Sequence, residues 1–483
     1  MADCPFNSAS ETIADFIYRN GSQQQFPGNS EDIPCMDFVS TDFSIIYTPL
    51  DTVEPISLSK FTYYSIPGLY TLLDSSSMDA SGILATHASP ALSNQGRGVI
   101  IGIIDTGIDY TNPLFRNQDG TTRILSIWDQ SLPEDKSLLP AGVPNRYNAS
   151  GASYGTEYTQ ERINEALESD NPFAVVPSTD TNGHGTFLAG IAAGGILPNQ
   201  DFTGAAPECE LVIVKLKPAK QYLRDFYLIS NDADAYQEND IMMGIKYLRV
   251  EAYSQRKPLV ILLGIGSNLG SHEGTSPLNV MIQDISRYLG MATVIAAGNE
   301  TGRGHHYMGS VPIGEESVEV EIRVGNAESQ RGFVVELWAD TADTYSVGFV
   351  SPSGESIGRI PIIGRNETSI PFLLEPTVIT VNYQLIETGA GKQLVFIRFE
   401  APTNGIWRIR VYNTQYLTGQ FNMWLPAHTL ISDETVFLTP SPYTTITLPG
   451  DSPSPITVGA YNHLNNSIYI HSGRGYTIGG LIK

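Results

Sequence analysis

Residues 181–190 read Thr-Asn-Gly-His-Gly-Thr-Phe-Leu-Ala-Gly, and the rest of the chain can be interpreted around this stretch. His184 stands between two glycines, just before an apolar run of small residues from Phe187 to Gly194. This run predicts a buried helix with His184 in its first turn. The flanking glycines let other backbone approach the imidazole, which suits a histidine that meets a nucleophile, an orienting carboxylate and a substrate. A histidine that only begins a helix would also match the pattern.

Two further apolar runs end in side chains that suit the same site. Residues 98–108 read Gly-Val-Ile-Ile-Gly-Ile-Ile-Asp-Thr-Gly-Ile, and residues 292–299 read Ala-Thr-Val-Ile-Ala-Ala-Gly-Asn. Runs of this kind predict buried parallel strands, and α/β sheets keep their sites at the carboxyl ends of such strands. We therefore expect Asp105 and Asn299 to reach one edge of a sheet. Alternatively, each of these two side chains could stabilise only the turn in which it lies.

Together the three stretches resemble the aspartate, histidine and asparagine motifs of the subtilisin-like serine proteases, or subtilases. The resemblance implies that His184 takes the proton of a serine nucleophile and that Asp105 orients the imidazole and stabilises its charge. It also implies that Asn299 donates its side-chain amide to the oxyanion, a contact whose loss typically costs about 100- to 1,000-fold in turnover. The implied activity is that of a serine endopeptidase acting on a protein or peptide substrate.

Another short stretch resembles the strand with which subtilases bind the backbone of their substrates. Gly264-Ile265-Gly266 stands where members of the family usually have Ser-Leu-Gly. The resemblance implies that the main chain of a substrate adds to the sheet at this edge, where the glycines cause no steric cost. Glycines that only make room for packing are the alternative interpretation.

Strands and helices alternate from residue 96 to residue 304. The runs 211–216 and 259–266 are typical of buried strands, and residues 240–248 have apolar side chains at helical spacing. This pattern predicts an α/β domain built on a parallel sheet with helices on both faces. Residues 445–483 resemble an incomplete continuation of the same subtilase domain.

Residues 305–444 have a different character, because helical periodicity disappears and turn residues separate short alternating or aromatic runs. The strand-like runs are 318–324, 332–338, 378–383, 394–399 and 406–412. This spacing predicts an inserted all-β sandwich or jelly roll. Subtilases that resemble the clostridial germination proteases carry a jelly roll at this place, between the oxyanion asparagine and the nucleophile. The insertion could stiffen the catalytic domain or bind a partner.

Residues 1–95 are expected to form a small α+β unit, in which Glu11–Arg19 is predicted as a helix and Ile66–Leu73 as a turn into a helix. In subtilases this position belongs to a propeptide, which assists folding and blocks the cleft with its tail. The resemblance implies a tail at Ser89–Gln95, cleavage near Gln95-Gly96, and a propeptide that can stay in the cleft. An N-terminal extension that is never removed is the alternative.

The family places its nucleophile in a Gly-Thr-Ser-x-Ala turn after a region that Ser472-Gly473-Arg474-Gly475 resembles, but no such turn follows before Lys483. We expect the catalytic serine to lie beyond Lys483, so that this chain alone does not hydrolyse peptides. A pseudoprotease that binds a partner or signal is the alternative. Gly274-Thr275-Ser276-Pro277 contains Gly-Thr-Ser, but it precedes Asn299, and Ser276 is expected to cap a helix.

Composition excludes several classes of protein. The 483 residues carry a formal net charge of −23, with 41% hydrophobic and 16% charged residues, so the chain is globular and is not expected to bind nucleic acid or anionic membranes. No apolar run is long enough for a membrane span. Esterases and lipases place the acid and histidine after the serine, whereas here both come first.

Further signals concern location and cofactors. Three cysteines, at positions 4, 35 and 209, cannot form a disulfide framework and match no metal site. The N-terminus lacks the basic and apolar regions of a signal peptide, which favours a cytoplasmic or spore-associated protein over a classically secreted one. We expect no cofactor and no catalytic metal. Structural calcium is common among subtilases, but its ligands cannot be assigned from this sequence.

Overall fold

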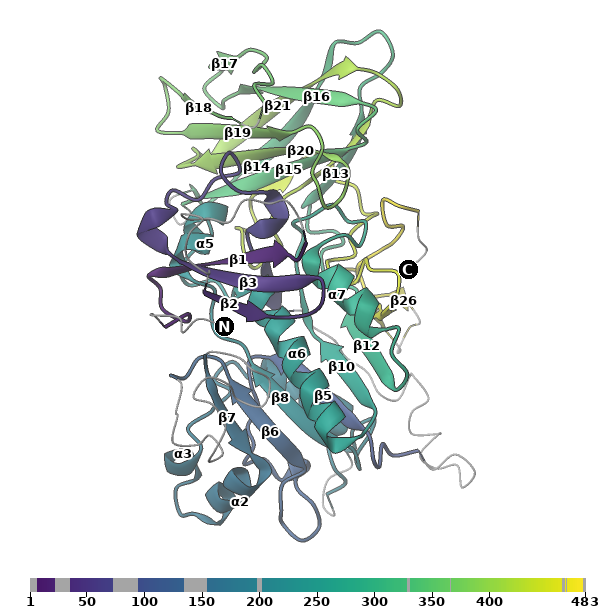
Figure 1. Cartoon of the computed structure of the whole chain (residues 1–483). Helices are drawn as coiled ribbons and strands as arrows, with labels where there is room; N and C mark the ends of the chain where they lie inside the picture. Colours follow the sequence, from purple (N-terminus) through teal and green to yellow (C-terminus); the bar gives the residue numbers. More distant parts are fainter. Residues whose placement is uncertain are drawn as a thin grey trace.

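The computed structural model contains an α/β unit, a small sheet from the N-terminal part of the chain and a β-rich unit at the other end of the molecule (Figure 1). The described residues are 7–21, 35–72, 94–133, 154–197, 202–327, 331–364, 366–462, 465 and 467–480.

The α/β unit is built on a seven-stranded sheet whose strands are parallel except for the last, β7. In spatial order the strands are β24 (Ile456–Val458), β12 (Met291–Ala296), β10 (Leu259–Leu263), β5 (Ile100–Asp105), β8 (Glu210–Lys215), β6 (Ile124–Asp129) and β7 (Thr156–Thr159). The central strand β5 is buried along its whole length. That burial on both faces explains why its sequence reads as an unbroken apolar run.

Helices cover both faces of this sheet, as the alternation of side chains along β5 requires. Ile100 and Ile104 face a core shared with α6 (Glu238–Gln255) and α7 (Pro277–Ile285). Ile101 and Ile103 face the opposite core, which contains residues of α2 (Gln160–Glu168) and α4 (His184–Ala193). The predicted α/β fold is therefore present, and β12 and β24 join the two parts of the chain that contribute to it.

The N-terminal unit contains a three-stranded antiparallel sheet in the order β1-β3-β2, formed by Ile13–Arg19, Phe43–Pro49 and Cys35–Phe38. The prediction of a helix over Glu11–Arg19 is wrong. Side chains from both faces of β1 are buried, Ile13 and Ile17 in one core and Ala14 and Phe16 in another. A strand covered on both faces has the short apolar run that cannot be told from a helix by periodicity.

A buried ion pair fastens this sheet to the α/β unit. The Lys220 Nζ atom lies 2.7 Å from an Asp15 carboxylate oxygen, and each side chain is 1% exposed. The same ammonium group donates to the backbone carbonyls of Ser8 and Ile13. All three acceptors come from the N-terminal unit, so Lys220 holds that unit in place.

The second expected helix in this unit is also absent, because Leu69–Leu72 form a strand, β4. This strand lies between β9 (Tyr236–Gln237) and β11 (Ile265–Gly266) and is antiparallel to both. The pairing partners lie more than 160 positions away in the chain, since Leu69 is opposite Gln237. Such pairing overrides the local preference of a short apolar segment.

The inserted unit consists of two antiparallel sheets whose inner faces share one core. One sheet contains β13 (His306–Ser310), β22 (Gln420–Trp424), β15 (Gly332–Ala339), β20 (Gln393–Glu400), β19 (Val378–Gln384) and β18 (Glu367–Pro371). The other contains β17 (Ser356–Ile357), β16 (Thr344–Val350), β21 (Gly405–Gln415), β14 (Ser317–Val324) and β23 (Val436–Phe437). The five predicted strands are confirmed, while the jelly-roll topology stays a prediction.

One buried carboxyl group lies where the three units meet. Glu336, on β15, accepts a 2.6 Å hydrogen bond from the Tyr63 hydroxyl of the N-terminal unit. It also accepts 2.9 Å hydrogen bonds from the backbone N–H of Gly270, in the α/β unit, and from the Trp338 indole. Because Glu336 is 0% exposed, these three donors replace the water that the carboxyl group loses on folding.

Candidate active site

Asp105 and His184 meet at the carboxyl edge of the sheet. Asp105 is the last residue of β5, and His184 is the first residue of α4. The His184 Nδ1 atom lies 2.8 Å from an Asp105 carboxylate oxygen, with side chains that are 14% and 1% exposed. A carboxylate at Nδ1 selects the tautomer in which this nitrogen carries the proton and Nε2 is the basic nitrogen.

Glycines bring the helix and the strand together at this point. Gly183, just before α4, has φ +88°, a left-handed conformation that favours glycine. A side chain at Gly185 would collide with the backbone carbonyl of Gly107, which follows β5. Gly185 therefore has the close-approach role that the sequence indicates, whereas Gly183 is required by its backbone conformation and has no neighbour among the described residues within 4 Å of an added Cβ atom.

Asp180 connects the loop after β5 to the first turn of α4. Its carboxylate accepts hydrogen bonds from the hydroxyl of Thr106 at 2.8 Å and from the backbone N–H of Gly183 at 2.9 Å. It also accepts the backbone N–H and the hydroxyl of Thr186, at 2.8 and 2.6 Å. Burial alone raises the pKa of Asp180, but these hydrogen bonds outweigh burial and hold the pKa below its usual value.

Sequence reasoning missed Asp180, although a signal was present. An aspartate shortly before a predicted helix is a candidate for the acceptor that satisfies the first N–H groups of that helix. Gly183 supplies no side-chain cap to α4. Asp180 takes this role from outside the helix and thereby fixes the position of His184.

Asn299 lies in the loop after β12, at the same edge of the sheet. The parallel registers place Leu263 of β10 beside both Ile104 of β5 and Ile295 of β12. Asp105, at the end of β5, and the loop after β12 that contains Asn299 therefore lie at the same edge of the sheet. The Asn299 side chain is partly buried, and its Oδ1 atom makes no hydrogen bond within the described ranges.

Glu300, the next residue, is a buried junction that sequence reasoning also missed. Its carboxylate lies 2.9 Å from the His305 Nδ1 atom and 2.8 Å from the His428 Nδ1 atom, and it accepts a 2.9 Å hydrogen bond from the Asn268 amide. Burial raises the pKa of Glu300, but the hydrogen bonds from His305 and His428 bring it far below its usual value. The asparagine loop is thus tied to the inserted unit and to the segment after β11.

The stretch Gly264-Ile265-Gly266 lies beside the Asp105–His184 pair. A Cβ atom added to Gly264 would lie 3.2 Å from His184 Cε1 and 3.4 Å from an Asp105 carboxylate oxygen. Ile265 and Gly266 form β11, which pairs with β4 of the same chain through Leu72 and Thr71. The strand expected to bind substrate backbone therefore carries a strand of the N-terminal unit.

The segment that lies beside Gly264 is not the tail expected at Ser89–Gln95. Most of Ser89–Gln95 lies outside the described residues, but Gln95 accepts a hydrogen bond from the backbone N–H of Glu208, just before β8 begins. That is the amino edge of the sheet, the length of a strand away from His184. The antiparallel register instead directs the end of β4, at Leu72, toward Gly264.

Ser276 lies where a helix cap is expected. Its hydroxyl accepts the backbone N–H of Asn279 in the first turn of α7 and donates to the Asn279 side chain. The serine is 2% exposed. It is therefore committed to the start of α7, in agreement with its predicted role.

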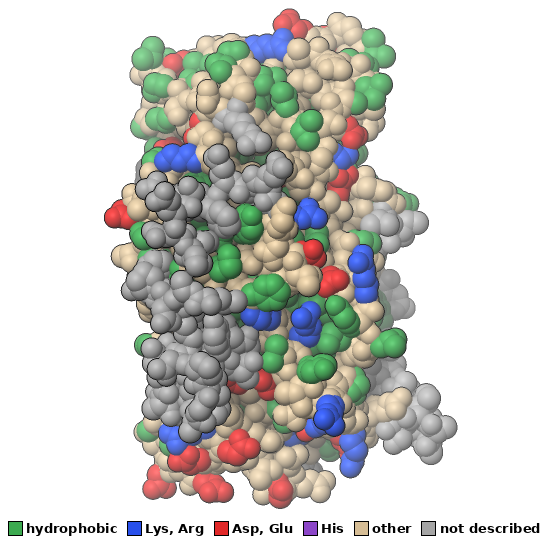
Figure 2. Space-filling view, in the orientation of Figure 1, with side chains coloured by type: hydrophobic (Ala, Val, Ile, Leu, Met, Phe, Trp, Pro, Cys, Tyr) green, Lys and Arg blue, Asp and Glu red, His purple; other side chains and the backbone are tan. Residues whose placement is uncertain are grey.

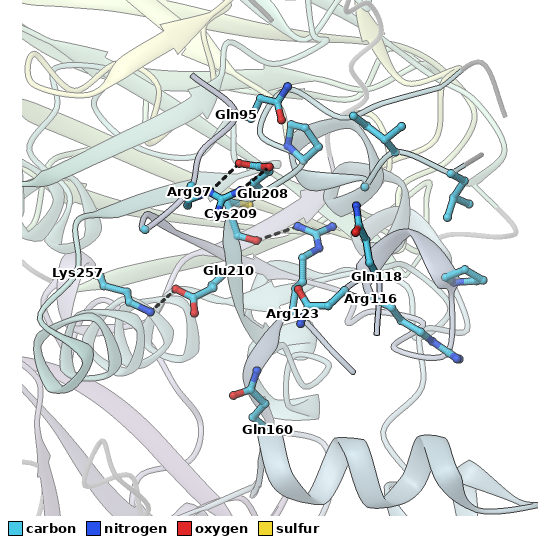
Figure 3. A pocket seen from close by; sticks show the side chains of 17 residues that line it. Gln95, Arg97, Arg116, Gln118, Arg123, Gln160, Glu208, Cys209, Glu210 and Lys257 are labelled. Carbon is cyan, nitrogen blue, oxygen red and sulfur yellow. Dashed lines mark hydrogen bonds and ion pairs between the residues drawn. The ribbon is translucent and has the colours of Figure 1, made fainter. Parts of the chain in front are cut away.

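A cavity of about 580 Å³ opens at the amino edge of the sheet (Figure 3). Its charged side chains are largely paired with one another. Arg97 binds Glu208 at 2.9 Å, and Lys257 binds Glu210. Arg123 donates to the backbone carbonyl of Cys209 at 2.8 Å, as Figure 3 shows. Sites of α/β sheets lie at the opposite, carboxyl edge, so the cavity is separate from the Asp105–His184 pair.

Two general features concern ligands and surface. Within the described ranges, no three His, Cys, Asp or Glu side chains lie together in a way that could hold a metal ion. No helix of the described residues is long and apolar enough to cross a membrane. On the face shown in Figure 2, Lys and Arg side chains are scattered and acidic side chains lie among them.

A largely parallel sheet that carries an aspartate–histidine pair at its carboxyl edge, next to a strand that pairs with extended backbone, agrees with the class of serine proteases. Comparison with known families agrees with this class. The model of the subtilase family, peptidase S8, matches residues 96–354, which is more than half of the chain, and the chain belongs to that family.

Individual relatives extend the comparison. The solved structure of the CspB protease of Clostridium perfringens is similar, with 30% sequence identity and a TM-score of 0.70, covering 84% of this chain and 77% of that one. Subtilisin-like protease SBT1.9 of Arabidopsis thaliana is 31% identical over 148 residues, which are 28% of this chain and 18% of the plant protein. The PII-type proteinase of Lacticaseibacillus paracasei is 24% identical over 266 residues, which are 54% of this chain and 12% of that proteinase. The chain thus spans less than a fifth of the length of these two curated relatives.

Proposed function

We propose that this chain is part of a subtilisin-type serine endopeptidase, in which Asp105, His184 and Asn299 act with a serine supplied beyond Lys483. The observation that carries the proposal is the 2.8 Å contact between His184 Nδ1 and the buried Asp105 carboxylate. In this mechanism His184 Nε2 takes the proton of the serine hydroxyl and later returns it to the leaving amine. Asp105 keeps the imidazole in the required tautomer and stabilises its positive charge.

Asn299 has the oxyanion role in this proposal, with its amide group donating to the negative oxygen of the tetrahedral intermediate. The turn that presents it is tightly packed, since Gly298 has φ +93° and a side chain there would meet Thr447. Substrate backbone pairs with Ile265 and Gly266, and Gly264 leaves space beside the imidazole. No bound metal or cofactor is part of this chemistry.

The serine is proposed to lie beyond Lys483 because the candidate upstream, Ser276, is committed to capping α7. The outer strand of the described sheet supports the proposal that further chain packs beside it. β24 has a neighbour only on the β12 side, and its apolar residues Ile456 and Val458 are 59% and 51% exposed. Apolar side chains on an edge strand are stabilised by further chain that covers them.

The N-terminal unit is the first partner in this proposal. Because β4 is paired with β11, residues 1–95 act as a propeptide that stays in the cleft. A cut made by the Asp105–His184 site is expected after β4 rather than at Gln95-Gly96. The buried Lys220–Asp15 pair would keep the cut unit attached.

A protein extended to include the downstream Gly-Thr-Ser-x-Ala segment tests the proposal. We expect this protein to hydrolyse labelled casein, and we expect His184→Ala to lower the turnover number about 10,000-fold or more. Asp105→Asn should show a similarly large loss. Asp119→Asn, at an exposed position of the same unit, serves as the matched control and should retain activity. The 1–483 chain should show no steady turnover.

The alternative function is that of a pseudoprotease that binds peptides without cutting them. The observation that favours it is the strand already seated on β11. An extended protein that binds peptides in the cleft but shows no hydrolysis would decide for this alternative. Turnover that depends on His184 would exclude it.

A further inference from the structure

The strand β4 shows which side chains the groove between β9 and β11 accepts. Its residues Leu69, Tyr70 and Thr71 are 0%, 2% and 1% exposed. Backbone pairing on both sides gives affinity for any extended segment, whereas the pockets for the side chains give specificity. The surroundings of Tyr70 and Thr71 therefore describe a preferred sequence.

The Tyr70 ring is buried in a largely apolar pocket. It shares a core with Ile241 and Leu278, from α6 and α7. Burial, together with the charge of Glu238, raises the pKa of the Tyr70 hydroxyl. The Glu238 carboxylate accepts the backbone N–H of Leu278 at 3.0 Å.

The Thr71 side chain contacts the inserted unit. Its hydroxyl forms a hydrogen bond with the hydroxyl of Thr429, which follows β22. Thr429 is held in position by its neighbour, because His428 binds Glu300 through both its backbone N–H, at 3.1 Å, and its Nδ1 atom, at 2.8 Å. A hydroxyl group presented by an anchored loop can distinguish a partner that forms a hydrogen bond from one that does not.

We propose that this groove selects peptides with a threonine or serine at the position of Thr71, and that Thr429 determines this preference. The substrate class rests on the proposed protease function. The proposal gives the inserted unit a role in specificity, because Thr429 becomes part of the groove wall.

Peptide binding tests the preference without requiring hydrolysis. The full chain is made with Tyr70→Ala and Thr71→Ala, which weakens its own strand and opens the groove. A labelled peptide of sequence Gly-Leu-Tyr-Thr-Leu is then titrated by fluorescence anisotropy. The same peptide with valine for threonine should bind about 3- to 5-fold more weakly, as expected for one lost hydrogen bond. Equal binding of the two peptides would overturn the proposal.

Thr429→Val in the same background is the matched control. It should abolish the difference between the threonine and valine peptides. Thr429→Ser should keep this difference, because it keeps the hydroxyl group. A Thr429→Val protein that still prefers threonine would contradict the assigned role of Thr429.

Hydrogen exchange of the unopened chain gives a second measurement, in case the doubly substituted protein does not fold. Thr71→Val should lower the protection of Leu69–Leu72 by about 3- to 5-fold, and Thr71→Ser should not. Adding Thr429→Val to Thr71→Val should cause no further loss, whereas additive losses would overturn the pairing. If the extended protein hydrolyses nothing while this selectivity holds, the proposed protease function fails and the assignment of the groove stands.

Discussion

The two aspartates near His184 have separate tasks that their hydrogen bonds define. Asp105 faces the imidazole directly, while Asp180 faces only the loop after β5 and the first turn of α4. The first task is chemical and the second is positional. A change at Asp180 should therefore lower the stability of this region. This effect can be measured separately from the pairing of Asp105 with His184.

We expect Asp180→Asn to lower the free energy of unfolding at neutral pH by about 1 to 2 kcal/mol, because the amide cannot accept all four hydrogen bonds. Since the pKa of Asp180 is lowered in the folded chain, its contribution is present above the ordinary carboxyl pKa and is lost as the pH falls through the folded value. Urea denaturation of both proteins at neutral and acidic pH checks this. A stability difference that does not shrink in acid would contradict the prediction.

At this scale the sequence predicts that Asp105 and His184 lie together, because glycine-rich turns surround both residues. Asp180 carries the local signal of an acceptor placed shortly before a helix. Glu300 instead acts through hydrogen bonds to segments that are distant in the chain, such as its link to His428. Local spacing carries no information about such partners.

At the scale of helices and strands, the N-terminal unit also shows that local sequence does not reveal distant partners. The sequence predicts the strands of the parallel sheet and the helix α4 because length and period agree with burial on one or two faces. It indicates helices at β1 and β4 because each is a short apolar run. What makes them strands is pairing with β3, β9 and β11, which the sequence of the segment itself does not reveal.

We expect Lys220→Met to destabilise the chain by about 3 to 5 kcal/mol, because it leaves Asp15 as an uncompensated buried charge. Adding Asp15→Asn should recover part of that loss. Urea denaturation measures the stability, and hydrogen exchange of Ile13–Arg19 shows whether the N-terminal sheet loosens first. A loss below about 1 kcal/mol in the single variant would show that the pair does not hold the sheet.

For the molecule as a whole, Glu336 is the point at which the three units share one group. Tyr63, Gly270 and Trp338 each come from a different segment of the chain and all donate to this carboxyl group. Burial raises the pKa of Glu336 to about 7, and the three hydrogen bonds offset only part of that rise. The charge state of a single side chain thus influences how firmly the units are joined.

We expect the Glu336 carboxyl group to make stability fall as the pH rises. Between the ordinary pKa of 4.5 and the folded value of about 7, the folded chain keeps a proton that the unfolded chain has released. The free energy of unfolding should therefore decrease across this window, by roughly 2 to 4 kcal/mol for this group. Glu336→Gln does not titrate, so subtracting its denaturation curve from that of the unchanged protein isolates the effect. A difference that is constant from pH 4.5 to 7 would exclude it.

The parallel pair formed by β12 and β24 has a consequence for how this chain folds. Residues 297–455 separate the two strands, so the pair cannot form during synthesis until the whole inserted unit has left the ribosome. Contacts between such distant segments slow folding. Until β24 arrives, the backbone of β12 on that side has no neighbour and can pair with another chain. Nascent copies of this protein should therefore depend on chaperones during that interval.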